Sequence, residues 1–448
     1  MIKIITYGTY DLLHFGHIRL LERAKALGDY LIVGVTADDF DRARGKINVQ
    51  QSLMERIEAV RQTGLADEII VEEYEGQKID DIKRYDVDIF AVGSDWQGVF
   101  DYLGEYCQVV YLPRTKGISS TELRAAQTKI RMGFVGSYSG IRRYADEVQY
   151  VNGMELTAVY CSRDKDACKA YYKDQVLIAE TYDQLLESSD AVYIVSHPSL
   201  HYEQILRALE AKKHVLCESP ITLSTNEMNE LYTFADSQGL VLMDSIKTAY
   251  STAFNRLTLL VKSGKIGDVV SVDAVCTSLA ELQMNDVTCL DNIWNSICAW
   301  GPTAFLPVFH ILGTDYRQKQ IVVNYLDKDK KFDRFAKISF TYSNAVASIL
   351  VGKGIKSEGE LVISGTKGYI YVPAPWWKTD YFEIRYEDQS QNKRFFYQLE
   401  GDGIRYLLAC FARMVSSGND ATKITRAGSK ATIQIIEDFY NNRDIFEI

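Results

Sequence analysis

The chain has 448 residues, of which 47% are hydrophobic and 25% are charged, and its net charge is -10. This length and composition predict two or three globular domains of ordinary core size. The negative charge excludes a sequence-independent grip on nucleic acid, which needs clustered Lys and Arg. The sequence offers no membrane span, no signal peptide and no CxxC pair among its eight Cys. We therefore expect a cytoplasmic protein with free thiols.

Residues 1–127 alternate between short apolar runs and amphipathic segments. The runs at 2–7 and 30–35 predict strands, and the spacing of apolar residues over 17–27 predicts a helix between them. The pattern continues with predicted helices at 54–64 and 79–85 and predicted strands at 68–73, 88–96 and 108–113. Strands that alternate with helices imply a parallel sheet with helices on both faces.

The same alternation starts again at residues 131–136, so we place a domain boundary near residue 128. Strands are predicted at 155–163, 191–196 and 214–219 with helices between them. Beyond about residue 250, long alternating segments predict an open, largely antiparallel sheet, and helices are predicted at 403–417 and 427–442. We expect three α/β domains, at 1–127, 128–248 and 249–448.

An HxGH motif, formed by His14 and His17 with Gly16 between them, lies at the turn from the first strand to the first helix. A turn that opens a helix offers free backbone N–H groups and the positive end of the helix dipole, which suit phosphate. Two imidazoles there can donate hydrogen bonds to phosphoryl oxygens as charge develops in a transition state. The alternative is an ordinary turn with two surface His, because short motifs match by chance.

A second polar motif, RTKGISST, occupies residues 114–121. Its Arg114 can hold phosphate in a two-pronged hydrogen-bonded fork. The hydroxyl groups of Ser119, Ser120 and Thr121 can cap the following helix and bind phosphate oxygens. A simple helix cap is the alternative, and the two roles are compatible.

Residues 1–127 resemble the glycerol-3-phosphate cytidylyltransferases along nearly their whole length, through 6–33, 86–103 and 109–121. The resemblance implies a Rossmann-like nucleotidyltransferase fold. It also implies direct attack of an alditol phosphate on the α-phosphorus of CTP, with release of pyrophosphate and without a covalent enzyme intermediate. One departure concerns residues 74–76, which read Tyr-Glu-Gly where the family carries a Trp, so the identity of the alditol phosphate stays open.

The same resemblance assigns roles to individual residues. It implies that His14 and His17 stabilise the transferring phosphoryl group, with catalytic help from Lys46 and Arg114. Asp11 supports the site and is the expected contact for Mg²⁺. The residues expected to bind CTP or its phosphates are Thr9, Tyr10, Asp11, Arg44, Asp95, Thr115, Ser119, Ser120 and Thr121.

In the second half, residues 132–143 follow a predicted strand and open a helix. The turn holds Gly136, Ser137 and Gly140, but it lacks the GxGxxG pattern and is alone a weak sign of dinucleotide binding. The next strand ends in Ser162-Arg163, where an acidic residue would bind the ribose 2′-hydroxyl of NAD. This pair favours NADP, although NAD stays open.

Residues 130–448 resemble the Gfo/Idh/MocA oxidoreductases, most clearly over 189–250 and 263–274. The resemblance implies a dinucleotide-binding Rossmann domain followed by an open-sheet domain, and assembly into homo-oligomers through sheet faces. It adds cofactor contacts at Ser196, His197, His201 and Glu218.

Two catalytic features of that family are missing. Its Glu-Lys-Pro appears here as Glu218-Ser219-Pro220, and apolar residues over 300–313 replace its Asp-x-x-x-His. Lys247 and Tyr250 follow a later strand and are the expected substitutes, the alternative for Lys247 being a solvated strand-end Lys. For His201, contact with the nicotinamide and simple packing stay open.

We therefore expect a bifunctional enzyme that makes a CDP-alditol for a cell-surface polymer such as teichoic acid. Its second half would reduce a sugar phosphate, a keto-sugar precursor or the CDP adduct with NAD(P)H, and its first half would activate the alditol phosphate with CTP and Mg²⁺. The alternative makes the second half a non-catalytic oligomerisation or ligand-sensing module, which the missing Lys and Asp/His favour.

Overall fold

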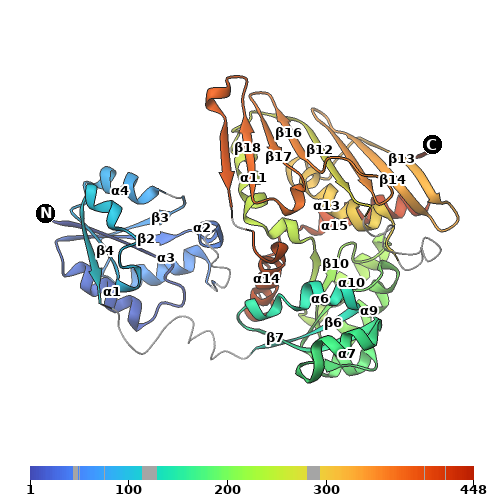
Figure 1. Cartoon of the computed structure of the whole chain (residues 1–448), viewed down its shortest axis with the longest axis horizontal. Helices are drawn as coiled ribbons and strands as arrows, with labels where there is room; N and C mark the ends of the chain where they lie inside the picture. The colour runs from blue at the N-terminus through green and yellow to red at the C-terminus, as the bar shows by residue number, and fades with distance from the viewer. Residues whose placement is uncertain are drawn as a thin grey trace. The chain divides into compact units, whose positions relative to one another are not determined.

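The computed structural model describes residues 1–43, 49, 51–74, 76–113, 129–279, 293–397, 399–418 and 420–448. Its contacts divide the chain into two compact units, Met1–Thr128 and Lys129–Ile448 (Figure 1). Within the described ranges, none of the helices combines the length and the apolar character needed to cross a bilayer. The same ranges contain no group of three or more His, Cys, Asp or Glu side chains suited to hold a metal ion.

The first unit is built on a five-stranded sheet in the order β3-β2-β1-β4-β5, and every neighbouring pair runs parallel. Ile4 and Ile5 of the central strand belong to two different buried clusters, because alternate side chains of a strand point to opposite faces. Helices cover both faces, as the alternating sequence predicts. The elements are β1 Lys3–Gly8, α1 Phe15–Lys25, β2 Tyr30–Thr36, α2 Asp38–Ala43, α3 Leu53–Gln62, β3 Glu68–Glu72, α4 Gln77–Tyr85, β4 Ile89–Gly93, η1 Ser94–Trp96, η2 Asp101–Glu105 and β5 Gln108–Leu112.

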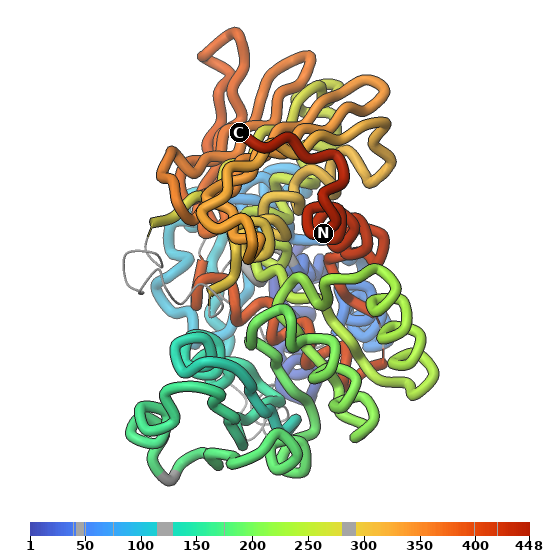
Figure 2. The backbone as a smooth tube through the Cα atoms, turned by 90° about the vertical axis from the view of Figure 1, so that its right-hand side faces the viewer, coloured from blue at the N-terminus to red at the C-terminus, as the bar shows by residue number. Residues whose placement is uncertain are grey.

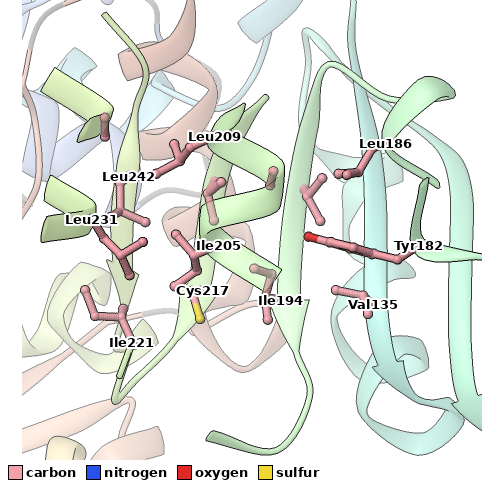
Figure 3. Packing of buried hydrophobic residues seen from close by; sticks show 14 of the residues in the cluster. Val135, Tyr182, Leu186, Ile194, Ile205, Leu209, Cys217, Ile221, Leu231 and Leu242 are labelled. Carbon is pink, nitrogen blue, oxygen red and sulfur yellow. The ribbon is translucent and has the colours of Figure 1, made fainter. Parts of the chain in front are cut away.

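The second unit begins with a six-stranded sheet in the order β11-β10-β9-β6-β7-β8, again parallel throughout. Apolar side chains from the strands and from α9 and α10 form its core, in which Ile205 and Leu209 of α9 pack near Cys217 and Leu242 (Figure 3). The elements are β6 Ile130–Ser137, α6 Tyr138–Ala145, η3 Val148–Tyr150, β7 Met154–Arg163, α7 Lys165–Tyr172, η4 Lys173–Gln175, β8 Leu177–Ile178, α8 Tyr182–Glu187, β9 Ala191–Val195, η5 Pro198–Leu200, α9 His201–Glu210, β10 His214–Glu218, α10 Thr225–Gln238 and β11 Leu242–Ser245.

A nine-stranded sheet completes the second unit, in the order β19-β18-β17-β16-β12-β15-β14-β13-β20. Neighbouring strands of this sheet run antiparallel, with two exceptions. β12 pairs parallel with β15, and the C-terminal strand β20, which is red in Figure 2, pairs parallel with β13. The open, largely antiparallel sheet expected from the sequence is confirmed. The elements are η6 Lys247–Tyr250, α11 Thr252–Lys262, β12 Val269–Thr277, α13 Ser296–Ile311, β13 Gln318–Asp327, β14 Phe332–Thr341, β15 Val346–Gly352, β16 Leu361–Gly365, β17 Tyr369–Val372, η8 Trp376–Lys378, β18 Tyr381–Arg385, η9 Gln389–Gln391, β19 Lys393–Phe396, η10 Gly401–Gly403, α14 Ile404–Ser417, α15 Arg426–Tyr440 and β20 Ile445–Glu447.

The apolar helix α13 packs against this sheet through β12, β14 and β15. Its first turn is held by Asn295, whose side chain accepts from the Cys298 N–H, and by the buried Asp333, which accepts from the Ser296 N–H at 2.8 Å. Burial raises the pKa of Asp333 to about 6. The stretch in which the sequence lacks an Asp-x-x-x-His pattern is therefore a structural core helix.

Strand order reverses once in each parallel sheet, beside β1 in the first and beside β6 in the second. Successive crossovers lead away from such a strand in both directions and leave a crevice at its carboxyl end, where open α/β sheets bind ligands. The turn after β1 carries the HxGH motif, and the junction of β6 with α6 carries Gly136, at the end of the strand, and Gly140, in the first turn of the helix. Both candidate sites therefore lie at positions that the topology favours.

Substitution of Gly136 tests how closely the end of β6 packs against β9. A Cβ atom added there would lie 2.8 Å from both Cγ2 and the carbonyl oxygen of Val195 on β9. Because β9 is central, we expect Gly136→Ala to cost about 1–3 kcal/mol through overpacking and to lower the thermal midpoint of the second unit by several degrees. Gly140→Ala is the matched control, since its nearest contact would be the Ser137 side chain at 3.2 Å. Equal midpoints for the two variants in calorimetry would contradict this account.

Candidate functional site

The HxGH turn presents two imidazoles at the start of α1. His14 is the N-cap residue, and its Nδ1 accepts a hydrogen bond from the Gly16 N–H at 3.0 Å. The ring of His17 stacks on the ring of His14 with centroids 4.0 Å apart. The motif therefore gathers two hydrogen-bonding rings beside the positive end of a helix dipole, where an anion is stabilised.

The backbone before this motif is strained. Tyr10 and Leu12 adopt positive φ angles of 53° and 47°, which cost free energy for side chains other than glycine. Gln51 secures the turn from another segment, because its backbone N–H donates to Asp11 Oδ1 at 3.0 Å and its Oε1 accepts from the Leu12 N–H at 2.7 Å. Asp11 is buried, so its carboxylate has a defined position at the turn.

Tyr10 does not reach a ligand with its side chain. Only 1% of the residue is exposed, and it belongs to the core on one face of the sheet. Its ring meets the ring of His17 edge-on at 5.5 Å. The prediction that Tyr10 binds CTP is therefore wrong for its side chain. That side chain instead packs against the ring of His17.

A buried arginine that the motif analysis missed holds the turn from the other side. Arg56 is fully buried and donates to the carbonyl oxygens of Thr9 at 2.6 Å and Thr36 at 2.8 Å. Its guanidinium also pairs with Asp38 and Asp41, and Thr9 Oγ1 donates to Asp41 at 2.8 Å. Arg56 thus fixes the position of the Thr9 backbone immediately before the motif. The only sequence signal is a charged residue on the apolar face of α3.

Asp95 is exposed on η1, directly after β4, the strand next to β1 across the reversal. This places it at the same edge of the sheet as the HxGH turn. Seven other predicted residues lie outside the described residues, and for them the assignments stay predictions: Arg44, Lys46, Arg114, Thr115, Ser119, Ser120 and Thr121.

In the second unit, the turn after β6 has the close backbone approach that a dinucleotide site requires. The side chain of Ser137 caps α6 by accepting from the Gly140 N–H at 3.3 Å. Ser162 Oγ donates to the Gly136 carbonyl at 3.2 Å, and the exposed Arg163 pairs in register with Ser137 across β6 and β7. A helix N-terminus, closely packed glycines and a cation at the next strand end are features that suit the phosphates of a nicotinamide dinucleotide.

Of the predicted cofactor contacts after β9, His197 lies at a helix N-cap, whereas Ser196 and His201 are buried. His197 is at the N-cap of η5, where its Nδ1 accepts from the Ser199 N–H. Ser196 is buried and donates to Gln204 Oε1 at 2.5 Å. His201 is fully buried, with its ring nitrogens 2.8 and 2.9 Å from the carbonyl oxygens of Pro220 and Ser196, and burial lowers its pKa to about 4. The prediction that His201 contacts cofactor is wrong, because both nitrogens face the protein backbone.

Glu218 ends β10 and is tied to its neighbours. Its Oε1 accepts from Tyr193 Oη at 2.5 Å and from Ser245 Oγ at 2.8 Å. These bonds link the end of β10 to both neighbouring strands, β9 and β11, and so fix the position of the Glu218 carboxylate. Its direct contact with the cofactor stays a prediction. Next to it, Ser219 is buried, and its hydroxyl is one of the groups that lower the pKa of Asp244 against the effect of burial.

Lys247 lies beside Glu218 at the carboxyl end of β11. Its side chain is only 13% exposed, and Nζ is 3.6 Å from Asp402 Oδ2. Burial and the nearby Arg143 lower the pKa of Lys247 to about 8, with a further contribution from Lys378, against the opposing charges of Asp402 and Glu218. This Lys is therefore not a solvated strand-end residue, and its ammonium can release a proton near neutral pH.

Tyr250, the predicted fallback donor, is placed differently. It is 3% exposed, and its hydroxyl contacts Thr422 Oγ1 at 3.1 Å and accepts from the Lys423 N–H at 3.3 Å. Burial raises its pKa well above the usual range for Tyr. The prediction of a catalytic role for Tyr250 is wrong, because its hydroxyl is buried and hydrogen-bonded to the segment before α15.

A protein-family model described as cytidylyltransferase-like matches residues 5–126. The glycerol-3-phosphate cytidylyltransferase of Bacillus spizizenii is 51% identical over 124 residues, which are 28% of this chain and 95% of that protein. The chain belongs to the glycerol-3-phosphate cytidylyltransferase family. The member from Staphylococcus aureus is 47% identical over 128 residues, or 93% of its length. The resemblance expected from the HxGH motif is thereby confirmed.

The second unit is additional to the cytidylyltransferase-like unit and is similar to other proteins. The Gfo/Idh/MocA model, described as an oxidoreductase family with an NAD-binding Rossmann fold, matches residues 130–245. The scyllo-inositol 2-dehydrogenase (NADP(+)) of Bacillus subtilis is 33% identical over 131 residues, but these are only 40% of that protein. The 3-ketoreductase KijD10 of Actinomadura kijaniata shares the fold with a TM-score of 0.62 at 22% identity, over 72% of this chain and 100% of that one.

His17 offers a direct test of the first site. We expect His17→Ala to lower the turnover of cytidylyl transfer by about a hundredfold or more, the effect of removing a preorganised transition-state donor. Affinity for CTP, measured by calorimetry, should change much less. Glu22→Gln on the same helix is the control, since Glu22 pairs with Arg19 on the surface. An unchanged rate of pyrophosphate release from His17→Ala would remove His17 from the transition-state role.

Proposed function

We propose that the chain is a bifunctional enzyme that reduces a small carbonyl compound and makes a CDP-alditol. The single observation that carries the first activity is the stacked His14–His17 pair at the start of α1. Glycerol 3-phosphate, on which the relatives are named to act, is the first acceptor to test. We propose Mg²⁺ as the companion of the triphosphate, because Mg²⁺ binds phosphates together with one or two carboxylates and Asp11 supplies a fixed one.

In the proposed first reaction, a phosphate oxygen of the alditol phosphate attacks the α-phosphorus of CTP and pyrophosphate leaves. The imidazoles of His14 and His17 donate hydrogen bonds to the phosphoryl oxygens, on which negative charge accumulates. Arg56 and Gln51 act as positioning residues, because both hold the backbone of the strained turn that presents the two rings. The product, a CDP-alditol, would be a precursor of a cell-surface polymer such as a teichoic acid.

For the second unit we propose reduction of a ketone or aldehyde by a nicotinamide dinucleotide. Gly136, Ser137 and Gly140 would hold the pyrophosphate, and Ser162 with Arg163 favours NADP over NAD. When bound, the reduced dinucleotide supplies the hydride. As the carbonyl carbon accepts that hydride, its oxygen becomes an alkoxide, and the Lys247 ammonium gives it a proton. Solvent then restores the proton on Lys247.

The absence of a Lys at position 219 also supports a second candidate, in which this unit is a non-catalytic oligomerisation or sensing module. The buried Lys247 beside the strand ends favours the reductase. Titration of the full chain with NADPH, followed by nicotinamide fluorescence, separates the two. The reductase requires saturable binding, whereas a module that has lost the dinucleotide site gives no saturable signal.

Lys247→Met tests the assigned proton donor. Methionine keeps much of the side-chain volume and removes the ammonium group, so we expect NADPH oxidation to fall by about a hundredfold or more. Pyrophosphate release by the first unit should stay unchanged. Lys393→Met, at an exposed position on β19, serves as the matched control. Full reductase activity in Lys247→Met, across a panel of keto sugars and their phosphates, would rule out this role.

The pH dependence of reduction follows from the same residue. The donor form of Lys247 is the ammonium, and its pKa is about 8, so we expect kcat for reduction to be level below that pH and to fall roughly tenfold per unit above it. Lys378→Met removes a neighbouring positive charge and should move the falling limb to higher pH. A limb at the same pH in both proteins would show that another group controls the rate.

A further inference from the structure

Three cations converge on one oxygen atom in the second unit. Lys378 Nζ donates to Asp402 Oδ2 at 2.6 Å, Lys247 Nζ lies 3.6 Å from that atom, and a guanidinium nitrogen of Arg143 lies 3.7 Å from it. The four residues come from separate elements, namely α6, η6, η8 and η10. Two contacts join three of these elements, η6, η8 and η10: Thr248 Oγ1 donates to the Trp377 carbonyl at 3.1 Å, and Lys378 bonds to Asp402.

The cluster has more positive charge and more donors than its own structure uses. Arg143, Lys247 and Lys378 face the carboxylates of Asp402 and Glu218, which leaves a surplus of one positive charge at neutral pH. The Lys247 ammonium has no hydrogen-bond partner in the part of the chain that the structure describes, and the Arg143 guanidinium, at 3.7 Å, is too far from Asp402 Oδ2 for a hydrogen bond. An Arg presents five N–H donors and a Lys three. A structural ion pair would use these donors and would not set three cations against one oxygen.

The neighbouring cations affect the ionisation of both Lys247 and Asp402. Arg143 and Lys378 both lower the pKa of Lys247. Burial tends to raise the pKa of Asp402, but the neighbouring Lys378, Lys247 and Arg143 together lower it. An arriving anion would relieve the repulsion among the cations, and the exposed side of the cluster leaves room for it to approach. The side chain of Arg143 is 48% exposed and that of Lys378 is 35% exposed, against 13% for Lys247.

We propose that Arg143 and Lys378 form a phosphate subsite, and that the substrate of the second unit is the phosphomonoester of a small keto polyol. This inference rests on the proposed reductase and names its substrate class. A phosphate has three terminal oxygens and carries between one and two negative charges, which matches a guanidinium fork and an ammonium better than a neutral sugar does. Lys247 remains directed to the carbonyl oxygen.

The close spacing of the three cations limits the size of this substrate. Because all three lie within 4 Å of one oxygen, a phosphate held by Arg143 and Lys378 leaves only a short carbon chain before the carbonyl reaches Lys247. Reduction of such a ketone gives an alditol phosphate. That product has the chemistry of the acceptor that the first unit is proposed to join to CTP, so the class of reaction in the second unit can supply the substrate of the first.

The test compares phosphorylated and neutral ketones in the full chain at saturating NADPH. Initial rates of NADPH oxidation are measured with dihydroxyacetone phosphate and D-ribulose 5-phosphate, and with dihydroxyacetone and D-ribulose. We expect Arg143→Met and Lys378→Met each to raise KM for the phosphates about 10- to 100-fold, as for the loss of one charged hydrogen bond, with a much smaller change in kcat. KM for the neutral ketones should not move. Arg142→Met is the matched control, because Arg142 pairs with Asp146 on the same helix.

Other phosphate sources give different results. If the cations instead hold a phosphate of the dinucleotide, both variants weaken NADPH binding by the same factor as they raise KM, and the inference is overturned. If the substrate is a cytidine diphosphate adduct, CDP-glycerol inhibits NADPH oxidation more strongly than glycerol 3-phosphate does, which also overturns it. Equal KM values for phosphorylated and neutral ketones would also overturn the proposed phosphate subsite, but they would not contradict the proposed reductase activity.

The inference can also be judged if the proposed reductase fails and no ketone is reduced. Calorimetric titration with dihydroxyacetone phosphate then counts binding sites without any turnover. One site fewer in Arg143→Met than in Arg142→Met supports the phosphate subsite, whereas equal stoichiometry overturns it. Thermal midpoints of the variants verify that both are folded.

Discussion

Reversal of strand order beside β1 and again beside β6 is the constraint on which the arrangement of this protein depends. In a parallel sheet all carboxyl ends meet at one edge, and only a reversal leaves that edge uncovered between two crossovers. Each reversal is followed by a short turn into a helix, so backbone N–H groups and a helix dipole face the opening. The chain uses the first for the HxGH motif and the second for a glycine turn. The chemistry differs because the side chains differ, while the geometry that admits a charged ligand is shared.

Charged side chains with hydrogen-bond partners on neighbouring elements keep both openings in shape. In the first unit, the fully buried Arg56 bonds to the Thr9 carbonyl, immediately before the strained turn, and to the Thr36 carbonyl at the end of β2. These bonds help to stabilise positive φ angles that the chain would otherwise avoid. In the second unit, Glu218 collects hydroxyl donors from two neighbouring strands. The loss of a Lys at position 219 leaves a small buried hydroxyl there, and an ammonium reaches the same region from the start of η6. In the proposed reductase, the proton donor would therefore occupy a different position in the sequence while remaining near the same strand ends.

Local patterns in the sequence were enough for the fold and for part of the sites. Apolar runs alternating with helical spacing gave both parallel sheets, and the helix predicted at 17–27 begins two residues earlier because His14 caps it. The HxGH motif is predictable because it lies between a predicted strand and a predicted helix, and Lys247 because it lies shortly after a predicted strand. Tyr10 and His201 were assigned to ligands from their place in a motif. Burial decides their role, and burial depends on packing that a motif does not contain.

The remaining contacts join residues that are far apart in the chain. Asp402 lies more than 250 residues after Arg143, and nothing in either local sequence links them. Likewise the partners of Arg56 lie on three separate segments, at Thr9, at 36–41 and at Gln51. Such clusters are products of tertiary packing between short 3-10 helices and loops, whose sequences have no periodicity to read. Residues 44–48 and 114–128, which carry several cations and hydroxyls assigned to CTP, lie outside the described residues.

The central claim is that one chain carries two linked activities, and a single incubation measures it. The full chain is mixed with CTP, NADPH and dihydroxyacetone phosphate, and products are identified by mass spectrometry, with each reagent omitted in turn. The account predicts CDP-glycerol only when all three are present, with NADPH consumed in equal amount. Formation of CDP-glycerol from added glycerol 3-phosphate, without NADPH consumption by any ketone or ketone phosphate, would contradict it and leave the chain a cytidylyltransferase with a non-catalytic second unit.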